Sequence, residues 1–252
     1  MVFPVSPPAR EVGGPPGHTY GAVLARTGDR TDADVLGPLR QIRFSGWLAR
    51  PDQGWLTAVA TPGGGTVAAG RRGVVGAGEW LAGRLPVPVL AVRVLADRQL
   101  ALVMWADGAE IGRYVSDPSR EPDAGDDVLP GPLGAEHAYA FADACGRPDA
   151  GDDLADVLAD ELDQDSVIES ERLARVLRLL GLPTWVVAAA TLPRDIPTGP
   201  RRRDLIRLGA GVPGALGRLC AGVVHPVRKR RPPPPVVADP PRGSSGVDPW
   251  LL

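Results

Sequence analysis

Three short runs of strand-forming residues near the middle of the chain constrain its fold more than any other feature. Val87–Leu95 and Gln99–Ala106 are apolar and rich in β-branched residues, and Ala109–Ser116 follows them. Asp107-Gly108 separates the second run from the third, and both residue types tolerate the positive φ that a tight hairpin requires. These runs therefore predict a three-stranded antiparallel meander.

A second hairpin is predicted upstream of the meander. Gln41–Ala49 and Trp55–Thr61 are strand-like, and Pro51-Asp52-Gln53-Gly54 between them is typical of a turn. Together the two units predict an antiparallel sheet of about five strands. With one or two helices, this sheet forms an α+β domain over residues 18–118. The expected helices are Asp32–Leu39 and Val74–Leu85.

An acidic helical module is predicted over residues 119–192. Its expected helices are Gly134–Cys145, Asp153–Leu162 and a third that begins at the capping box Ser166-Val-Ile-Glu169. The third helix carries one apolar stripe and ends where Gly181 can act as a C-cap. The stripe consists of Leu173, Val176, Leu177 and Leu180.

Both ends of the chain predict segments outside a packed core. The chain has 28 Pro and 32 Gly, a share just below the roughly 25–30% that is typical of low-complexity disorder. Residues 1–17 are expected to form a mobile Pro-rich arm. Residues 193–252 are expected to form a disordered, basic, Pro- and Arg-rich tail, with one possible short helix at Pro213–His225.

The charges are strongly segregated along the chain. Residues 121–171 contain 16 acidic residues and one basic residue, whereas residues 194–231 contain 10 basic and two acidic residues. Blocks of opposite sign can contact each other or align a partner. The alternative is a solvated acidic helical face followed by a basic tail.

Composition suggests a bacterial protein of the cytoplasm. Arg supplies 27 of the 28 basic residues, and Lys229 is the single Lys. This bias is typical of a GC-rich genome. The first residues lack the basic and apolar regions of a signal peptide. Cys145 and Cys220 are therefore expected to be free thiols.

One repeated hexapeptide is a candidate cation site. Pro-Asp-Ala-Gly-Asp-Asp occurs at residues 122–127 and again at 148–153. Several carboxylates around a Gly bend suit Ca²⁺ or Mg²⁺, although the spacing is not that of an EF-hand loop. The alternative is an acidic turn that caps the helix after it. The candidate metal ligands are Asp123, Asp126, Asp127, Asp149, Asp152 and Asp153.

Two basic clusters are candidate contacts for a polyanion, an anionic lipid or a protein partner. They consist of Arg201, Arg202 and Arg203, and of Arg228, Lys229, Arg230 and Arg231. Clustered cations bind phosphates through charge, and such binding weakens with salt. A solvated basic tail is the alternative for both clusters. Pro232–Pro235 could also bind a partner groove as polyproline II.

Sequence support for catalysis is weak. There is no G-x-S-x-G nucleophile elbow, and the three His residues are scattered. No cofactor is predicted. The leading hypothesis is a non-enzymatic interaction or regulatory protein with an unknown protein partner. The alternatives are a divalent-cation-dependent enzyme that uses the repeated hexapeptides, and binding to nucleic acid or a membrane surface through the tail.

Overall fold

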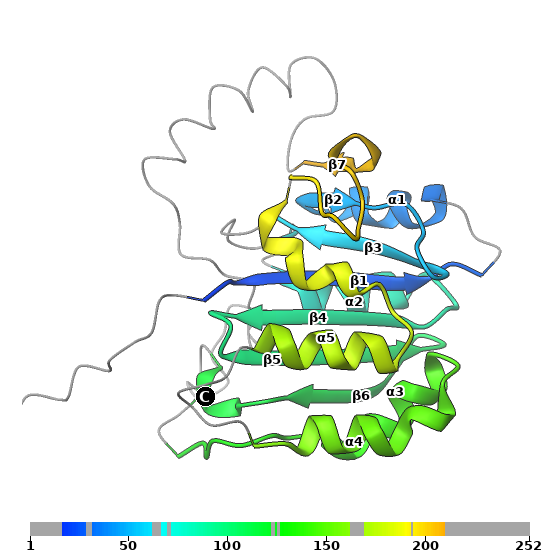
Figure 1. The fold of residues 1–252 in the computed structure, drawn as a ribbon. Helices are drawn as coiled ribbons and strands as arrows, with labels where there is room; N and C mark the ends of the chain where they lie inside the picture. Colours follow the sequence, from blue (N-terminus) through cyan, green and yellow to red (C-terminus); the bar gives the residue numbers. More distant parts are fainter. Residues whose placement is uncertain are drawn as a thin grey trace, which may run out of the picture.

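The computed structural model describes residues 17–28, 32–61, 67–69, 72–121, 124, 127–161, 169–192 and 194–209. Within these residues the chain forms one seven-stranded antiparallel sheet in the order β6-β5-β4-β1-β3-β2-β7 (Figure 1). The strands are β1 (Tyr20–Arg26), β2 (Gly46–Leu48), β3 (Trp55–Ala60), β4 (Val89–Leu95), β5 (Gln99–Ala106), β6 (Ala109–Val115) and β7 (Ile206–Leu208).

The α+β class and the antiparallel meander are confirmed, but the sheet has seven strands and not about five. One strand that the sequence analysis missed is β1, which lies at the centre of the sheet. Its first six residues are all buried, so it has no alternation of polar and apolar residues. The other missed strand is β7, which has three residues and pairs with β2 inside the segment expected to be a tail.

Helices cover both faces of the sheet (Figure 1). On one face, α1 (Asp32–Gln41) and α2 (Val74–Ala82) enclose a core that includes Val23, Leu39 and Leu81. On the other, α3 (Ala138–Ala144), α4 (Gly151–Ala159), α5 (Glu169–Leu179) and the 3-10 helix η4 (Thr184–Thr191) pack on the strands. The remaining short 3-10 helices are η1 (Pro118–Arg120), η2 (Ala135–His137), η3 (Pro148–Ala150) and η5 (Arg202–Asp204).

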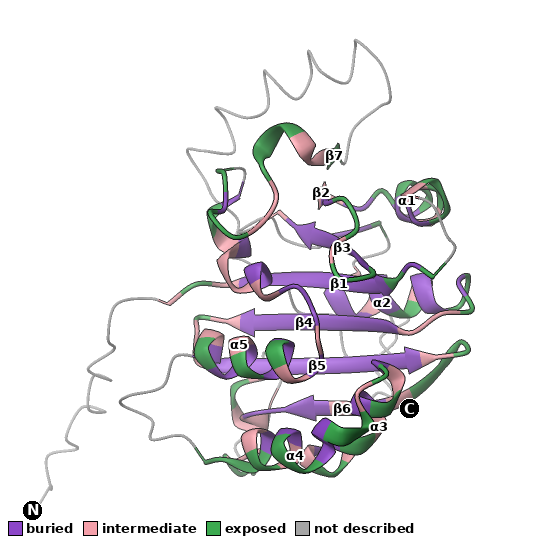
Figure 2. Ribbon diagram, turned by 45° about the vertical axis from the view of Figure 1, so that its right-hand side comes forward, coloured by how far each residue is buried: buried purple, intermediate pink, exposed green. Residues whose placement is uncertain are grey.

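The helices of the acidic segment share one buried core with the sheet. Leu102 of β5, Phe141 of α3, Leu158 of α4 and Leu177 of α5 are all fully buried in this core. Figure 2 shows the same pattern, with buried strands beneath helices whose outer faces are exposed. The 18–118 and 119–192 segments therefore bury their apolar faces against each other.

Two tight turns join neighbouring strands as the sequence predicts. Asp107 and Gly108 have φ of 50° and 80°, and Gln53 and Gly54 have φ of 52° and 78°. Positive φ at both central residues matches the right-handed twist of the strands. These turns fix the register of two of the hairpins.

The helices expected between residues 32 and 181 are present with shifted ends. The helix expected at 153–162 spans Gly151–Ala159, and the one expected at 134–145 spans Ala138–Ala144 after η2. The described residues resume at Glu169, so Ser166 of the capping box lies outside them. The 1–16 part of the expected arm, the 213–225 helix and the rest of residues 210–252 also lie outside them.

Candidate functional site

The N-terminus of α5 is held by the turn between β4 and β5. The amide of Glu169 donates to the carbonyl of Asp97 at 3.0 Å, and the amide of Ser170 donates to Oδ1 of Asp97 at 2.9 Å. The Ser170 hydroxyl also donates to Asp97 at 2.5 Å and shares a hydrogen bond of 2.8 Å with Tyr20. The turn thus satisfies amides that a helix leaves unpaired at its start. Asp97 has a φ of 58° in this turn.

A buried ion pair follows in the first turn of α5. Nε of Arg172 lies 3.4 Å from Oε2 of Glu169, and the two side chains are only 3% and 4% exposed. The same guanidinium donates to the hydroxyl of Tyr114 on β6 and to the carbonyls of Asp160 at 2.5 Å and Leu158 at 3.4 Å. Arg172 therefore links α5 to β6 and to the end of α4.

Burial dominates the electrostatics of this pair. It raises the pKa of Glu169, while the charge of Arg172 and a hydrogen bond from Ser116 lower it again. The carboxylates of Asp97 and Asp117 add smaller upward contributions. Burial also raises the pKa of the Tyr114 phenol. The Tyr114 hydroxyl is therefore neutral at pH 7 and serves as a structural acceptor for Arg172.

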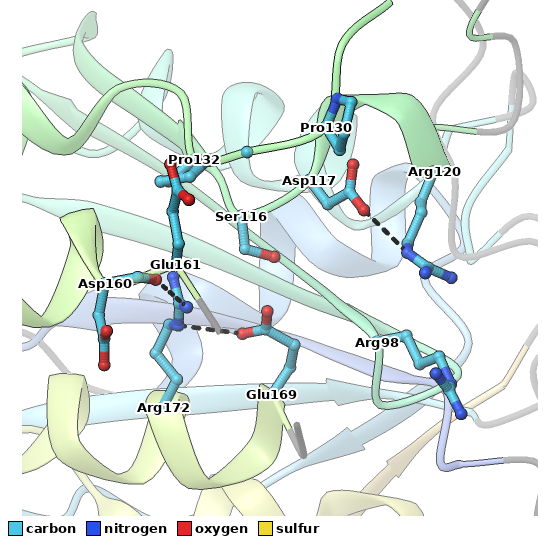
Figure 3. Close-up of a pocket in the computed structure, with 11 residues that line it drawn as sticks. Arg98, Ser116, Asp117, Arg120, Pro130, Pro132, Asp160, Glu161, Glu169 and Arg172 are labelled. Atoms are coloured by element: carbon cyan, nitrogen blue, oxygen red, sulfur yellow. Dashed lines mark hydrogen bonds and ion pairs between the residues drawn. The ribbon is translucent and has the colours of Figure 1, made fainter. Parts of the chain in front are cut away.

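The ion pair lies in the wall of a cleft of about 190 Å³ (Figure 3). The cleft is located where α5, the end of α4 and the loops around β5 and β6 meet. Arg120 is paired there with Asp117 at 2.8 Å, and Asp117 also accepts from the amide of Ser119 at 3.1 Å. The remaining lining residues are Arg98, Ser116, Pro130, Gly131, Pro132, Asp160 and Glu161.

Two buried atoms of the cleft wall lack a hydrogen bond among the described residues. Oε2 of Glu169 and Nε of Arg172 face each other as an ion pair, but neither has a hydrogen-bond partner. A buried polar atom without such a bond costs about 1–3 kcal/mol. Both atoms are almost fully enclosed, so their mutual ion pair compensates part of this cost.

Apolar side chains border the cleft on the loop that precedes α3. Leu129 is 81% exposed and Leu133 is 63% exposed, while Pro130 and Pro132 between them line the cleft. The loop is fixed to the edge of β6, because Leu133 and Val115 exchange two backbone hydrogen bonds of 2.9 Å each. We call Leu129–Leu133 the rim loop. Among the described residues, the large exposed apolar side chains are those of Leu129, Leu133 and Tyr139.

The predicted metal ligands fall in two places. Asp123 and Asp126 lie outside the described residues, and Asp127 is exposed. In the second hexapeptide, Asp149 lies 3.7 Å from Arg147, and Asp152 accepts from the hydroxyl of Tyr139 at 2.8 Å. Within the part of the chain that the structure describes, no three His, Cys, Asp or Glu residues gather as a possible metal site.

The second hexapeptide forms the start of a helix. Pro148–Ala150 is η3, and Asp152 and Asp153 lie in the first turn of α4. Acidic side chains there complement the positive end of the helix dipole. The N-cap position of α4 is occupied by Ala150, so neither Asp152 nor Asp153 is the N-cap residue. The metal site itself stays a prediction, because two of its ligands are not described.

The two basic clusters also separate. Arg201, Arg202 and Arg203 are exposed on and before η5, next to the β7 edge of the sheet. The backbone amide of Arg202 donates to Oδ1 of Asp195 at 2.7 Å. Residues 228–231 lie outside the described residues.

The described nucleophile candidates are in structural positions. Burial raises the pKa of the Cys145 thiol to about 12, so it is protonated at pH 7. Nδ1 of His137 lies 2.9 Å from the carbonyl oxygen of Arg113 and 3.2 Å from that of Gly134. These contacts fix the His137 ring over the edge of β6.

Sequence reasoning missed the buried pair of Glu169 and Arg172. It treated Glu169 only as part of a capping box. A signal was present, because positions 169, 172, 173, 176 and 180 follow the spacing of one helix face. Two charged residues on the apolar stripe of a helix predict a buried ion pair.

The comparisons with known proteins identify no relative. No protein-family model matches the chain, and neither the curated proteins nor the solved structures contain a significant match. Among the described residues, no helix is long and apolar enough to cross a membrane. The candidate site therefore rests on its own geometry.

Proposed function

We propose that this protein is a non-enzymatic interaction protein that binds a partner at the cleft and the rim loop. The observation that carries the proposal is the exposure of Leu129 and Leu133, at 81% and 63%, beside a cleft with buried charged groups. Exposed apolar side chains bordered by polar residues are typical of interaction sites. Burying them against a partner gains about 25 cal/mol per Å².

The charges next to the rim loop favour a partner segment that is both basic and apolar. Asp160 and Glu161 line the cleft and are exposed, and Asp153 and Asp156 are exposed on α4. A basic side chain would meet these carboxylates while its apolar neighbours cover the rim loop. Complementary charge adds selectivity and speeds association.

The interaction hypothesis is preferred to the enzyme alternative because two buried titratable groups, Glu169 and Cys145, have structural roles. Glu169 is paired with Arg172, and Cys145 is buried with a raised pKa. The cation-dependent enzyme and binding to a polyanion or anionic lipid through the tail stay predictions. The cytoplasmic location also stays a prediction.

Affinity capture with matched baits tests the proposal. The full chain is compared with L129S/L133S, and with the control R40S/Q41S, which changes two exposed residues of α1 on the opposite face of the sheet. We expect a protein that is captured by the full chain and by the control and is lost from L129S/L133S. An identical set of captured proteins for all three baits would contradict the proposal, as would the absence of any captured protein.

A further inference from the structure

The two ends of the sheet carry opposite charges. The edge at β6 lies beside α4, whose Asp152, Asp153 and Asp156 are exposed (Figure 1). The edge at β7 adjoins η5, where three consecutive arginines are exposed. These arginines are therefore held at the end of the sheet that is opposite to the acidic helix.

The cleft beside the acidic edge has a net negative lining. It contains three arginines and four carboxylates. Arg120 and Arg172 each have a carboxylate partner, Asp117 and Glu169 respectively. Asp160 and Glu161 are the lining carboxylates that are exposed, so they can pair with an added cation despite the arginines.

A second basic run of the same chain can reach this cleft. The described structure ends at residue 209, directly after β7, and 18 residues (210–227) separate it from Arg228. That length of chain spans up to roughly 60 Å. The seven strands of the sheet, at about 4.8 Å each, place its two edges only about 29 Å apart.

We propose that the basic run Arg228-Lys229-Arg230-Arg231 of this chain occupies the cleft and is displaced by the partner. This proposal rests on the proposed function, because the basic run covers the same surface that binds the partner. The cationic side chains pair with Asp160 and Glu161 where these line the cleft. Attachment to the same chain gives the run an effective concentration on the order of millimolar, so a weak contact suffices.

Zero-length crosslinking of the full chain tests this contact. Lys229 is the single Lys, so a carbodiimide that joins amines to carboxylates has one lysine target in the protein. We expect amide bonds from Lys229 to Asp160 or Glu161, with a yield that falls as salt is added because screening weakens exposed ion pairs. This crosslink should be absent in D160N/E161Q. It should persist in D153N/D156N, a control that removes two exposed charges from α4.

Three results would overturn the proposal. The first is crosslinking of Lys229 only to Asp239, which is near it in sequence, or no crosslinking at all. The second is crosslinking of Lys229 to Asp153 and Asp156 in a yield equal to that at Asp160 and Glu161. The third is a crosslink that joins two molecules in a mixture of isotope-labelled and unlabelled protein, since the occupant would then be a second copy. Partner capture by the full chain and by L129S/L133S is measured separately, so the two proposals can fail independently.

Discussion

Arg172 has the largest number of structural partners at the candidate site. Its side chain is 3% exposed, and it contacts Glu169, Tyr114 and the carbonyls of Leu158 and Asp160. A buried ion pair need not stabilise a fold more than apolar residues would, but removal of one partner typically costs about 3–5 kcal/mol. The pair therefore fixes how α4, α5 and β6 meet around the cleft.

The raised pKa of Glu169 predicts how stability changes with pH. Burial raises this pKa above its ordinary value of 4.5, so the folded protein binds the proton more tightly than the unfolded chain does. The stabilisation from protonated Glu169 is present at low pH and is lost as the pH rises from about 4.5 through the folded pKa. We expect the free energy of unfolding of Glu169→Gln to increase, relative to that of the original protein, between pH 4.5 and 7.

The matched control for this prediction is Glu171→Gln, because Glu171 is exposed on the same helix. The difference in free energy of unfolding between Glu171→Gln and the original protein should change little over this pH range. Urea unfolding at several pH values measures both differences. A difference for Glu169→Gln that stays constant or decreases with pH would contradict the prediction.

At the scale of the elements, α5 connects the cleft to the core. Leu173, Val176 and Leu177 on its apolar stripe are fully buried against the sheet and neighbouring helices. Its N-terminus is bound by the turn at Asp97, and its first turn carries the buried ion pair. The position of the cleft wall therefore depends on the packing of this one helix.

Leu177→Ala tests that dependence. Removal of a fully buried leucine side chain leaves a cavity, so we expect a loss of about 2–5 kcal/mol in the free energy of unfolding. Arg175→Ala on the exposed face of α5 is the control and should change stability little. Thermal or denaturant unfolding measures both variants. An unchanged melting temperature for Leu177→Ala would show that α5 does not pack as described.

The repeated hexapeptides provide a prediction about metal binding. Asp152 and Asp153 lie in the first turn of α4, where they complement the helix dipole without a metal ion. We expect calorimetry to detect no Ca²⁺ or Mg²⁺ binding tighter than the millimolar range. A tight stoichiometric isotherm that is abolished by D126A/D127A or D152A/D153A would contradict this prediction and favour the enzyme alternative.

At the scale of the whole molecule, the sequence predicted elements with strong local patterns. The Asp107-Gly108 hairpin and the stripe on α5 are set by residues that are close together in the chain, and both are confirmed. The central strand β1 was missed because both of its faces are buried, which removes the alternating pattern. The three-residue strand β7 depends on pairing with β2, which no local signal reports.

The cleft could not be predicted because tertiary packing assembles it. Its lining comes from the β4–β5 turn, the end of β6, the rim loop, the end of α4 and the start of α5. Charge segregation indicated an acidic region, but it did not indicate that Glu169 and Arg172 would be buried together beside exposed leucines. Predicting such a site requires the packing of α5 on β5 and the contact of Arg172 with β6, as well as the sequence of each element.

The central claim is that this cleft binds basic chain segments. The most direct measurement is calorimetric titration of a peptide with residues 226–233 into the full chain carrying R228Q/K229Q/R230Q/R231Q, whose own basic run is neutralised. We predict saturable binding of one peptide per chain that weakens with added salt and is lost when D160N/E161Q are also present. Equal binding with and without D160N/E161Q, or no binding at low salt, would contradict the account.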